Sequence, residues 1–558
     1  MQNLLYLPDR LFTNSDSRDF DALAIKHFVK NSNELMQQAG KDSFEKIKEL
    51  WPYTEKLLIF VGTGNNGGDG YVIANIACQN NIPVDVIQIG NIKQITKTAN
   101  NAYNELIKSN INNKNLNIIN ISSNKIKEIL EQVYKNNINV CNLVIVDALL
   151  GTGIKDKPKS DFLDAVVFIN NLKQHNKKSR VLAIDVPSGL NSDTGYVHDG
   201  IAVKADALIC FIVLKQGLFT GYAKEYCKDI YFSDLGVGDK LDEFNKKSKE
   251  NITTKAHLIS DINLDKYVKL KRREQYKSKH DFGHVVILGG DYGMGGAALM
   301  AGLAALRTGA GLVTIATHPS NAELIFLKQP ELMTFGIDFN LFSENYSDND
   351  YNFESEDRLA SLLDRADVLV LGPGLGQSAW GKRVWGSIKN YHARPIVLDA
   401  DGLNWLAKDQ EKRDIIRDNW VLTPHPGEAG RLLGLNSDII QQDRFKAIEQ
   451  ILAEYHGVCV LKGSGSIISK YEQHNKNNLK YVCPLGNPGM ATAGMGDILS
   501  GVIGSLIAQG LDLKEAAQLA VVIHSKAADN IKDEYGEKGI LATDLLFEIK
   551  KLVNLYSE

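Results

Sequence analysis

The sequence of 558 residues has no run of 18 apolar residues, so we expect no membrane-spanning helix. Its N-terminus lacks a basic region followed by an apolar core, and we therefore expect no secretory signal. Neither charge sign dominates, since 63 Lys and Arg stand against 67 Asp and Glu, for a net charge of -4. This balance gives no basis for a nucleic-acid or membrane partner.

The cysteines are few and scattered, and no two of them form a C-x-x-C pair. This spacing predicts neither a zinc site nor a disulfide framework. We interpret the six as reduced thiols of a cytoplasmic protein. They are Cys78, Cys141, Cys210, Cys227, Cys459 and Cys483.

The chain is too long for one ordinary core, and its 44% apolar and 23% charged residues are those of a globular protein. Buried-strand patterns alternate with glycine-rich loops and helical patterns, which indicates α/β domains. A charged stretch without a strong apolar period begins near residue 239. We therefore predict domains at 1–240 and 261–558, joined by a linker at 241–260.

In the first half, residues 56–61 predict a buried strand, the loop 62–70 follows, and a helix is expected from Tyr71. The loop combines five glycines with two asparagines and an aspartate, whose oxygens suit a hard cation or ribose hydroxyls. Residues 15–50 predict helix with a break at Gly40, and residues 109–139 an exposed, variable region.

Two further apolar strands, near residues 143–147 and 181–185, each end on an aspartate. Since loops at the carboxyl ends of parallel strands converge on the ligand crevice, we expect Asn66, Asp147 and Asp185 to meet. The alternative is that each of these residues caps the helix that follows it.

The three loops GTGNNGGDG (62–70), DALLGTG (147–153) and DVPSGLNSDTG (185–195) resemble those of the NAD(P)H-hydrate epimerase family. The resemblance implies a Rossmann-like three-layer sandwich that interconverts the R and S epimers at C6 of the hydrated nicotinamide ring. It implies a potassium ion held by Asn66, Asp147 and Ser188. Asp185 is the candidate acid/base. The implied substrate contacts are Asn65, Asn66, Gly67, Gly68, Asp69, Gly151, Thr152, Gly153 and Asp185, within a loop that extends to about Lys157.

In the second half, residues 486–497 (GNPGMATAGMGD) form a turn of small residues before an apolar run. A helix that starts at Asp497 would direct unpaired N–H groups out of this turn, and such a helix end binds phosphate or another anion. The carboxylate of Asp497 is placed to act as a base on a substrate hydroxyl. The alternative is that Asp497 only caps a buried helix.

Repeated strand–loop–helix patterns surround this turn, with the loops GPGLG (372–376), DADGLN (399–404), TPHPGE (423–428) and KGSGS (462–466). Together they resemble the ADP/ATP-dependent NAD(P)H-hydrate dehydratase branch of the ribokinase-like fold. The implied contacts with the hydrated nucleotide are Ala297, Gly374, Gly376, His425 and Asp497. The implied contacts with the adenine nucleotide are Lys462, Gly463, Ser464, Gly465, Ser466 and Gly496.

These resemblances imply that ADP or ATP phosphorylates the C6 oxygen after Asp497 removes its proton, and that phosphate then leaves to regenerate NAD(P)H. Magnesium is expected with the phosphates, and Asp399 and Asp401 stay open between helix caps and substrate or metal ligands. A lone His425 could also be structural. We expect a homo-oligomer. The rival hypothesis is a ribokinase-like small-molecule kinase with a non-catalytic N-terminal binding module.

Overall fold

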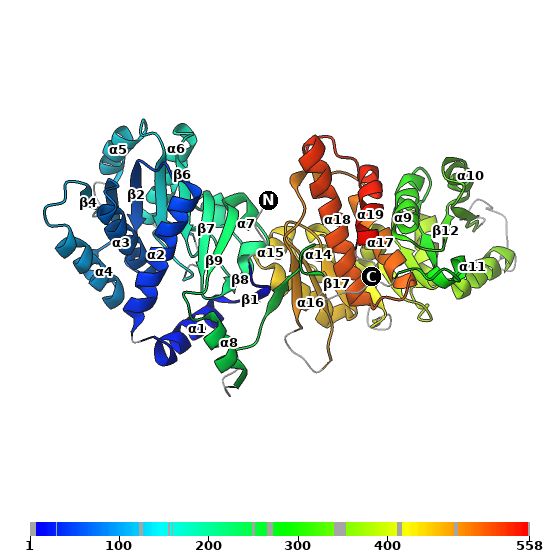
Figure 1. The fold of residues 1–558 in the computed structure, drawn as a ribbon. Coiled ribbons are helices and arrows are strands. Elements are labelled where there is room, and N and C mark those ends of the chain that lie inside the picture. The colour runs from blue at the N-terminus through cyan, green and yellow to red at the C-terminus, as the bar shows by residue number, and fades with distance from the viewer. Residues whose placement is uncertain are drawn as a thin grey trace. The chain divides into compact units, whose positions relative to one another are not determined.

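The structure is a computed structural model that describes residues 7–29, 31–121, 126–153, 157–158, 160–247, 252–264, 272–339, 353–409, 416–473 and 478–555. It divides into two compact units, Met1–Ala256 and His257–Glu558 (Figure 1). The range predicted as a linker, 241–260, includes the end of helix α8 (Gly238–Lys247) and strand β10 (Ala256–Leu258), while residues 248–251 lie outside the described residues.

The main sheet of the N-terminal unit is parallel and has the strand order β4-β3-β2-β5-β6-β7-β9. This order, with the first strand in the middle and the chain reversing beside it, is that of a Rossmann-like fold and confirms the prediction. A short strand β1 (Arg10–Phe12) pairs in parallel with β8 (Leu214–Lys215). The sheet strands are β2 (Lys56–Val61), β3 (Val84–Ile89), β4 (Leu116–Ile121), β5 (Leu143–Ala148), β6 (Arg180–Ile184), β7 (Ala205–Phe211) and β9 (Cys227–Ser233).

Helices cover both faces of this sheet, as the alternation of side chains along β2 shows. Leu57, Ile59 and Val61 join the core formed with α2 and α3, whereas Phe60 points to the other face and lies 5.7 Å from the ring of Phe168 on α6. The unit is therefore the predicted three-layer sandwich. Its helices are α1 (Asn14–His27), α2 (Ser32–Leu50), α3 (Asn65–Gln79), α4 (Lys97–Ser109), α5 (Ile126–Asn137), α6 (Asp161–His175), α7 (Ala223–Tyr226) and α8.

The predicted helix break at Gly40 is wrong, because α2 continues through it. A β-carbon at Gly40 would overlap the side chain of Val72 on α3. The glycine therefore lets two helices approach closely, and the chain breaks earlier, between α1 and α2.

Two further expectations for this unit are corrected. Helix α3 begins at Asn65, inside the stretch predicted as a loop, rather than at Tyr71. The region 109–139 contains strand β4 and helix α5, whose apolar residues Leu130 and Val133 are buried. The region contains so many asparagines and lysines that the spacing of its apolar residues did not predict these two elements from the sequence.

The C-terminal unit has a second, mostly parallel sheet in the order β13-β12-β11-β14-β15-β16-β17, followed by β18 and β19. The first seven strands are parallel, as predicted from the repeated strand–loop–helix units. After β17 the chain turns back, so β18 and β19 are antiparallel. The strands are β11 (His284–Leu288), β12 (Leu312–Thr317), β13 (Met333–Gly336), β14 (Val368–Leu371), β15 (Ile396–Leu398), β16 (Trp420–Leu422), β17 (Val458–Leu461), β18 (Ser466–Lys470) and β19 (Lys480–Cys483).

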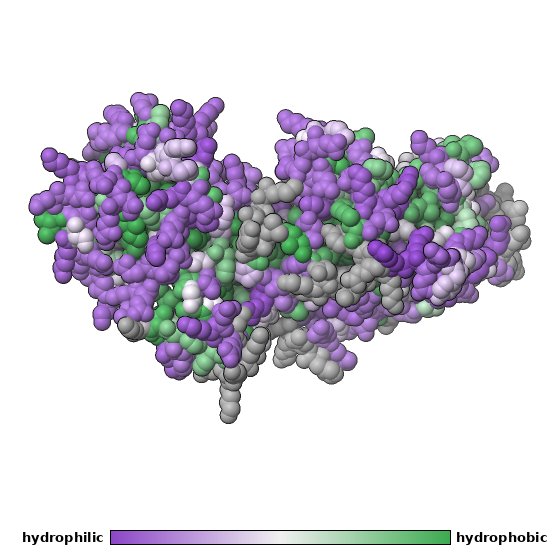
Figure 2. All heavy atoms as spheres, viewed as in Figure 1, coloured by the Kyte–Doolittle hydropathy of each residue, from purple (hydrophilic) through white to green (hydrophobic). Residues whose placement is uncertain are grey.

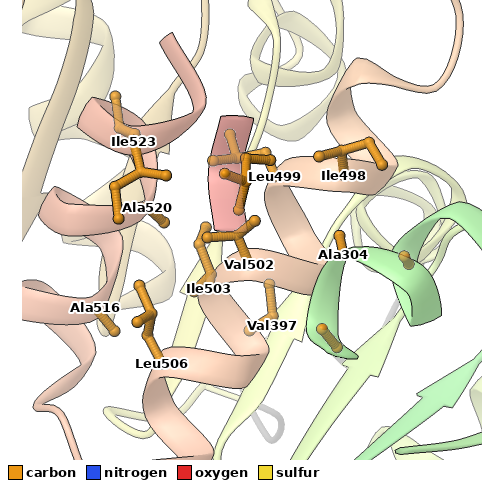
Figure 3. Close-up of a cluster of buried hydrophobic side chains, with 14 of the residues drawn as sticks. Ala304, Val397, Ile498, Leu499, Val502, Ile503, Leu506, Ala516, Ala520 and Ile523 are labelled. Atoms are coloured by element: carbon orange, nitrogen blue, oxygen red, sulfur yellow. The ribbon is translucent and has the colours of Figure 1, made fainter. Parts of the chain in front are cut away.

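Helix α17 (Met495–Ala508) is the centre of this unit's core. It packs between α9 (Gly295–Thr308) and α18 (Leu513–Tyr535), with Ala304 and Val397 from neighbouring elements beside it (Figure 3). A helix apolar on all sides is expected to be buried. The other helices of the unit are α10 (Pro319–Lys328), α11 (Phe353–Arg365), α12 (Ala379–Ile388), α13 (Ala400–Lys408), α14 (Pro426–Leu433), α15 (Ser437–Gln442), α16 (Arg444–Tyr455) and α19 (Leu545–Leu555).

The visible face of each unit carries mostly hydrophilic residues, with smaller hydrophobic areas between them (Figure 2). Over the described ranges, no helix combines the length and the hydrophobicity needed to cross a membrane. All six cysteines are described and each is a free thiol, with only Cys141 exposed.

Close packing between α9 and α17 should make Gly501 intolerant of a side chain, because a β-carbon there would overlap the backbone oxygen of Ala301. We expect Gly501→Val to lower the free energy of unfolding by ~1–3 kcal/mol. Gly386→Ala, on an open helix surface, should instead stabilise by up to ~1 kcal/mol. Denaturant unfolding followed by tryptophan fluorescence tests both, since Trp51 alone lies outside the C-terminal unit. Equal stability of the two variants would contradict this packing.

Candidate active sites

The first site of interest lies where β2, β5 and β6 end in the N-terminal unit. Asp147 stands near the end of β5, in register with Phe60 and Ala183 on the two neighbouring strands. Its buried carboxylate accepts hydrogen bonds from the Ser188 hydroxyl at 2.6 Å and the Ser188 amide at 2.8 Å. Burial raises the pKa of Asp147 to about 6, although the bonds from Ser188 act to lower it.

Asn66 reaches the same place from the first turn of α3. Its Nδ2 donates to the Leu150 carbonyl at 3.2 Å, and the Ser188 Oγ lies at the same 3.2 Å from that carbonyl. The Asn66 Oδ1 is buried and has no hydrogen-bond partner. The structure thus brings Asn66, Asp147 and Ser188 together around the Leu150 carbonyl.

This group of oxygens fits a hard monovalent cation. Asn66 Oδ1 is an acceptor without a donor, and an unpaired buried acceptor is costly unless a ligand satisfies it. Asp147 contributes one negative charge, which a single positive charge would neutralise. The remaining donors, an amide, a hydroxyl and a carbonyl, are neutral oxygens of the kind that hard cations prefer.

The alternative that Asn66 and Asp147 cap the helices that follow them is wrong. Gly64, and not Asn66, is the N-cap of α3, and no side chain caps this helix. Ser160 is the N-cap of α6, the helix after Asp147. Since Asn65, Gly67 and Gly68 form the first turn of α3, its N–H groups point toward the strand ends, where they suit an anionic ligand.

The loop after β5 lies against this turn. Gly151 is beside Asn66, and the Thr152 carbonyl accepts a hydrogen bond from the buried Asn14 at the start of α1. Around Gly153 a side chain would meet open space. Within the predicted loop, residues 154–156 lie outside the described residues.

Asp185 belongs to a second group of charges in this unit. Its backbone has a φ of 65°, a left-handed conformation that costs energy in a non-glycine residue. Its carboxylate forms an ion pair with Lys215, whose side chain is buried. The Lys215 ammonium also donates to the Phe211 carbonyl at 3.1 Å. Burial acts to lower the pKa of Lys215, but the charge of Asp185, the hydrogen bond to it and the charges of Cys210 and Asp21 together outweigh burial, so the pKa is raised.

Two more carboxyls, Asp69 and Asp21, interact electrostatically with this pair. Burial, and then the charges of Asp185 and Asp21, raise the pKa of Asp69 well above its ordinary value. Burial raises the pKa of Asp21 to about 6, against the opposing effect of Lys215. One lysine therefore lies in a group with three carboxyls, two of which have a raised pKa.

In the C-terminal unit, an ion pair of the same kind lies at the ends of β15 and β17. The Lys462 ammonium lies 2.7 Å from Asp399 Oδ1, which also accepts a hydrogen bond from the Thr423 hydroxyl at 2.8 Å. A β-carbon at Gly496 would stand 3.3 Å from both Lys462 and Asp399. The predicted residues Lys462 and Gly496 are thus neighbours, and Asp399 joins them.

Asp497 stands in the first turn of α17, and its role as a helix cap is excluded. The helix begins at Met495, two residues earlier than predicted, and its N-cap is Gly494, with φ 92° and no side-chain cap. Burial, followed by the negative charge of Asp399, raises the pKa of Asp497 to about 7, while Lys462 acts to lower it. A carboxyl with this pKa can act as a base near neutral pH.

His425 caps the start of helix α14, and about half of its side-chain surface is exposed to solvent. Its Nδ1 accepts from the Gly427 amide at 3.0 Å, and Glu428 Oε2 accepts from the His425 amide at 2.8 Å, which completes a capping box at α14. Burial, and then the positive charge of Lys462, lower the pKa of His425 to about 4. The ring is therefore neutral with its proton on Nε2, the nitrogen that can donate.

Ala297, Gly374 and Gly376 lie together at the start of α9. A β-carbon at Gly374 would stand 3.1 Å from the Ala297 β-carbon, and one at Gly376 would overlap Asp291. Gly374 and Gly376 have φ values of 60° and 70°. The Gly376 amide donates to Asp401 Oδ2 at 3.0 Å, which shows that Asp401 holds this loop.

The loop from Lys462 to Ser466 joins β17 to the antiparallel β18. Gly463 and Gly465 have φ values of 139° and 65°, Ser464 is exposed, and the Ser466 hydroxyl donates to the Gly463 carbonyl at 3.2 Å. The part of the chain that the structure describes contains no group of three or more His, Cys, Asp or Glu arranged to hold a metal ion. Protein side chains alone therefore provide no magnesium cage in these regions.

Sequence reasoning missed several residues of both sites. Lys215 and Asp21 lie far along the chain from Asp185, and only their position in the fold pairs them with it. Glu428, which lies 3.7 Å from Lys462, had a signal in the sequence, since the spacing from His425 to Glu428 is that of a capping box.

Comparison with known proteins matches both halves of the chain. Residues 32–217 match the family described as YjeF-related protein N-terminus, and residues 285–551 match the family described as NAD(P)H-hydrate dehydratase.

Similar proteins cover nearly the whole chain. A bifunctional NAD(P)H-hydrate repair enzyme of Coxiella burnetii is 39% identical over 98% of this chain and 99% of its own length. The bifunctional NAD(P)H-hydrate repair enzyme of Escherichia coli K12 is 35% identical over 93% of this chain and 89% of its own length. Among solved structures, the ADP/ATP-dependent NAD(P)H-hydrate dehydratase of Bacillus subtilis, co-crystallised with ATP and Mg²⁺, is 25% identical and covers 53% of this chain and 98% of its own, with a TM-score of 0.43.

The charges around Asp497 predict how its pKa responds to substitution. Removing the cation in Lys462→Met should raise the pKa of Asp497 above about 7, and removing the anion in Asp399→Asn should lower it. Carbon-13 NMR of aspartate carboxyls, assigned with Asp497→Asn, measures these values. A pKa near that of an exposed aspartate, or shifts of the opposite sign, would show that these charges do not control Asp497.

Proposed function

The chain belongs to the family of bifunctional NAD(P)H-hydrate repair enzymes, and we propose that the two strand-end sites act in sequence on one substrate. The enzyme is an isomerase in its N-terminal half, which interconverts R- and S-NAD(P)H hydrate. It is a hydro-lyase in its C-terminal half, which returns the S epimer to NAD(P)H at the expense of ADP or ATP. The observation that best supports the assignment of roles is the position of Asp497 at the uncapped start of α17, beside Lys462 and Gly496.

For epimerisation, the proposed acid and base are Asp69 and Asp185. Asp185, paired with Lys215, is the carboxylate that accepts a proton, and Asp69, whose pKa burial raises, is the carboxyl that donates one. Protonation of the C6 hydroxyl lets it leave as water, and the ring nitrogen stabilises the resulting cation. Water then adds to the opposite face and gives its proton to Asp185, which completes the epimer exchange.

The proposed substrate contacts in this half are Asn65 to Asp69, Gly151 to Gly153 and Asp185. The first turn of α3 lacks a side-chain cap, which supports binding of the substrate's phosphates there. Asn66, Asp147 and Ser188 are the proposed potassium ligands, and the unpartnered Asn66 Oδ1 supports this. A bound potassium ion would supply fixed positive charge next to the substrate.

For dehydration, Asp497 takes the proton of the C6 hydroxyl, and the terminal phosphoryl group of ADP or ATP moves to that oxygen. The N–H groups at the start of α17 and the ammonium of Lys462 stabilise the charge that develops on the phosphoryl oxygens. Phosphate then leaves with the help of the ring nitrogen, and loss of a proton from C5 of the resulting cation to the departing phosphate or to water forms the C5–C6 double bond of NAD(P)H. Magnesium, in this proposal, arrives with the nucleotide phosphates.

Substrate contacts in this half are Ala297, Gly374, Gly376 and the Nε2–H of His425. The residues Lys462, Gly463, Ser464, Gly465, Ser466 and Gly496 are proposed to contact the adenine nucleotide. A cytoplasmic location, to which the free thiols lend support, and a homo-oligomeric state complete the proposal.

The two roles are separable by substitution. Asp185→Asn should slow epimer exchange ~10²–10⁴-fold and leave dehydration of the pure S epimer unchanged, and Asp497→Asn should do the reverse. The assay incubates mixed hydrate epimers with ADP or ATP, magnesium and potassium, and follows reduced nicotinamide absorbance and inorganic phosphate. Wild-type dehydration should also fall as the pH drops below about 7, since Asp497 then becomes protonated.

Three outcomes would contradict this assignment. A stable phosphorylated product without phosphate release would favour the small-molecule kinase. An unchanged exchange rate in Asp185→Asn would remove its acid/base role. Loss of both activities in either variant would show that the halves are not independent.

Potassium binding is testable without the catalytic assay. Potassium chloride, compared with choline chloride at equal ionic strength, should raise the unfolding temperature of the wild type, since a ligand at 100 times its Kd stabilises by ~2.7 kcal/mol. Asn66→Ala should remove this response. Asn75→Ala is the matched control, since Asn75 is a buried asparagine of the same helix that accepts from Asn110 at 2.9 Å. An equal response in both variants would exclude Asn66 as a ligand.

A further inference from the structure

A buried arginine lies behind the loop proposed to contact the adenine nucleotide. Arg444, the first residue of α16, has a fully buried side chain. One nitrogen, Nη2, donates to the carbonyls of Leu461 at 3.1 Å, Lys462 at 3.3 Å and Gly465 at 3.4 Å. The other, Nη1, lies 3.3 Å from the Lys462 carbonyl and 3.0 Å from Gln441 Oε1. The guanidinium therefore ties both ends of the loop to one rigid fork.

The loop has the shape that this guanidinium requires. A β-carbon at Gly463 would stand 2.8 Å from the Arg444 Nη1, so only glycine leaves room for it. Both Gly463 and Gly465 adopt positive φ values that other residues rarely take. Gly463 of the K-G-S-G-S pattern is therefore required by packing against Arg444, in addition to any contact with a ligand.

The same bonds set the direction of the loop's amides. In a trans peptide the carbonyl of one residue and the N–H of the next point in opposite directions. Since the carbonyls of Lys462 and Gly465 face the guanidinium, the N–H groups of Gly463 and Ser466 are directed away from it. A phosphate or ribose on that side would meet N–H donors, and the buried positive charge behind them favours an anion.

We propose that Arg444 is a positioning residue for adenine-nucleotide binding, which holds residues 461–466 in the conformation that contacts ADP or ATP. The inference rests on the proposed role of residues 462–466 in nucleotide binding. Arg444 lies on the far side of the loop from the ligand and contacts neither substrate. Burial lowers the pKa of its guanidinium to about 10, so the side chain stays charged at neutral pH.

Steady-state kinetics of Arg444→Lys and Arg444→Met test the proposal. We expect the KM for ADP or ATP to rise roughly tenfold or more, since several charge-assisted hydrogen bonds are lost. The KM for the hydrate should change little, and epimerisation in the same chain should be unaffected. Lysine should restore binding in part, and free guanidinium ion, at a concentration far below that which unfolds the protein, should lower the nucleotide KM of Arg444→Met.

Arg417→Met is the matched control for a general loss of stability. Arg417 is also a buried arginine of this unit and donates to the backbone carbonyls of Tyr391 and Lys389, away from the loop. We expect it to lower the unfolding temperature and leave the nucleotide KM unchanged. If both arginine variants raised that KM equally, or if folded Arg444→Lys bound the nucleotide as the wild type does, the positioning role would be wrong.

A variant of the loop itself separates this inference from the proposed function. Ser464 is exposed, and Ser464→Glu places a negative charge where phosphates are proposed to bind, with Ser464→Gln as the neutral control. A higher nucleotide KM in Ser464→Glu together with a normal KM in both Arg444 variants would overturn only the role of Arg444. An unchanged KM in Ser464→Glu as well would overturn the nucleotide role of the loop.

Discussion

A lysine paired with a strand-end aspartate lies in each site, the buried Lys215 with Asp185 in the N-terminal unit and the partly buried Lys462 with the buried Asp399 in the C-terminal unit. An ion pair of this kind costs desolvation energy, so its presence at a ligand site is better explained by function than by stability. The lysine offsets the charge of the one carboxylate with which it pairs. The neighbouring carboxyls, Asp21 and Asp69 in one unit and Asp497 in the other, have less positive charge to offset the cost of burying a negative charge.

Burial, which this limited positive charge offsets only in part, raises the pKa of the nearby acids. In the C-terminal unit, Lys462 already faces Asp399 and Glu428, and the pKa of Asp497 rises to about 7. In the N-terminal unit, the pKa values of Asp21 and Asp69 rise in the same way. Both reactions need a proton to leave or reach a C6 oxygen, and a carboxyl with a raised pKa can serve that step at neutral pH.

The positions of the strand-end acids Asp147, Asp185 and Asp399 could be predicted from the sequence, because apolar strands that end on an acid in a parallel sheet bring their acids to one edge. Asp147 lies near the end of β5, and Asp399 directly follows β15. The partners could not be predicted. Lys215 meets Asp185, and Arg444 meets the residue 461–466 loop, only because distant segments fold together. Gly40 looked like a helix break because the sequence does not reveal that Val72 packs against it.

The helices that begin at the two sites lack the side-chain caps found on other helices. Helices such as α2, α12 and α18 have side-chain caps from Asn31, Ser378 and Asp512, whereas α3 and α17 begin at Gly64 and Gly494 without one. Uncapped N–H groups next to buried carboxyls need an acceptor, and the acids repel one another unless a cation or a bound ligand changes the balance. In the proposal, the start of α3 therefore receives phosphates of the hydrated nucleotide, the start of α17 receives the phosphoryl group of ADP or ATP, and a carboxyl in each site meets the C6 hydroxyl. The C6 hydroxyl of the hydrated nicotinamide nucleotide is the feature that both proposed sites share, and it accounts for two units with different sheets acting on one substrate.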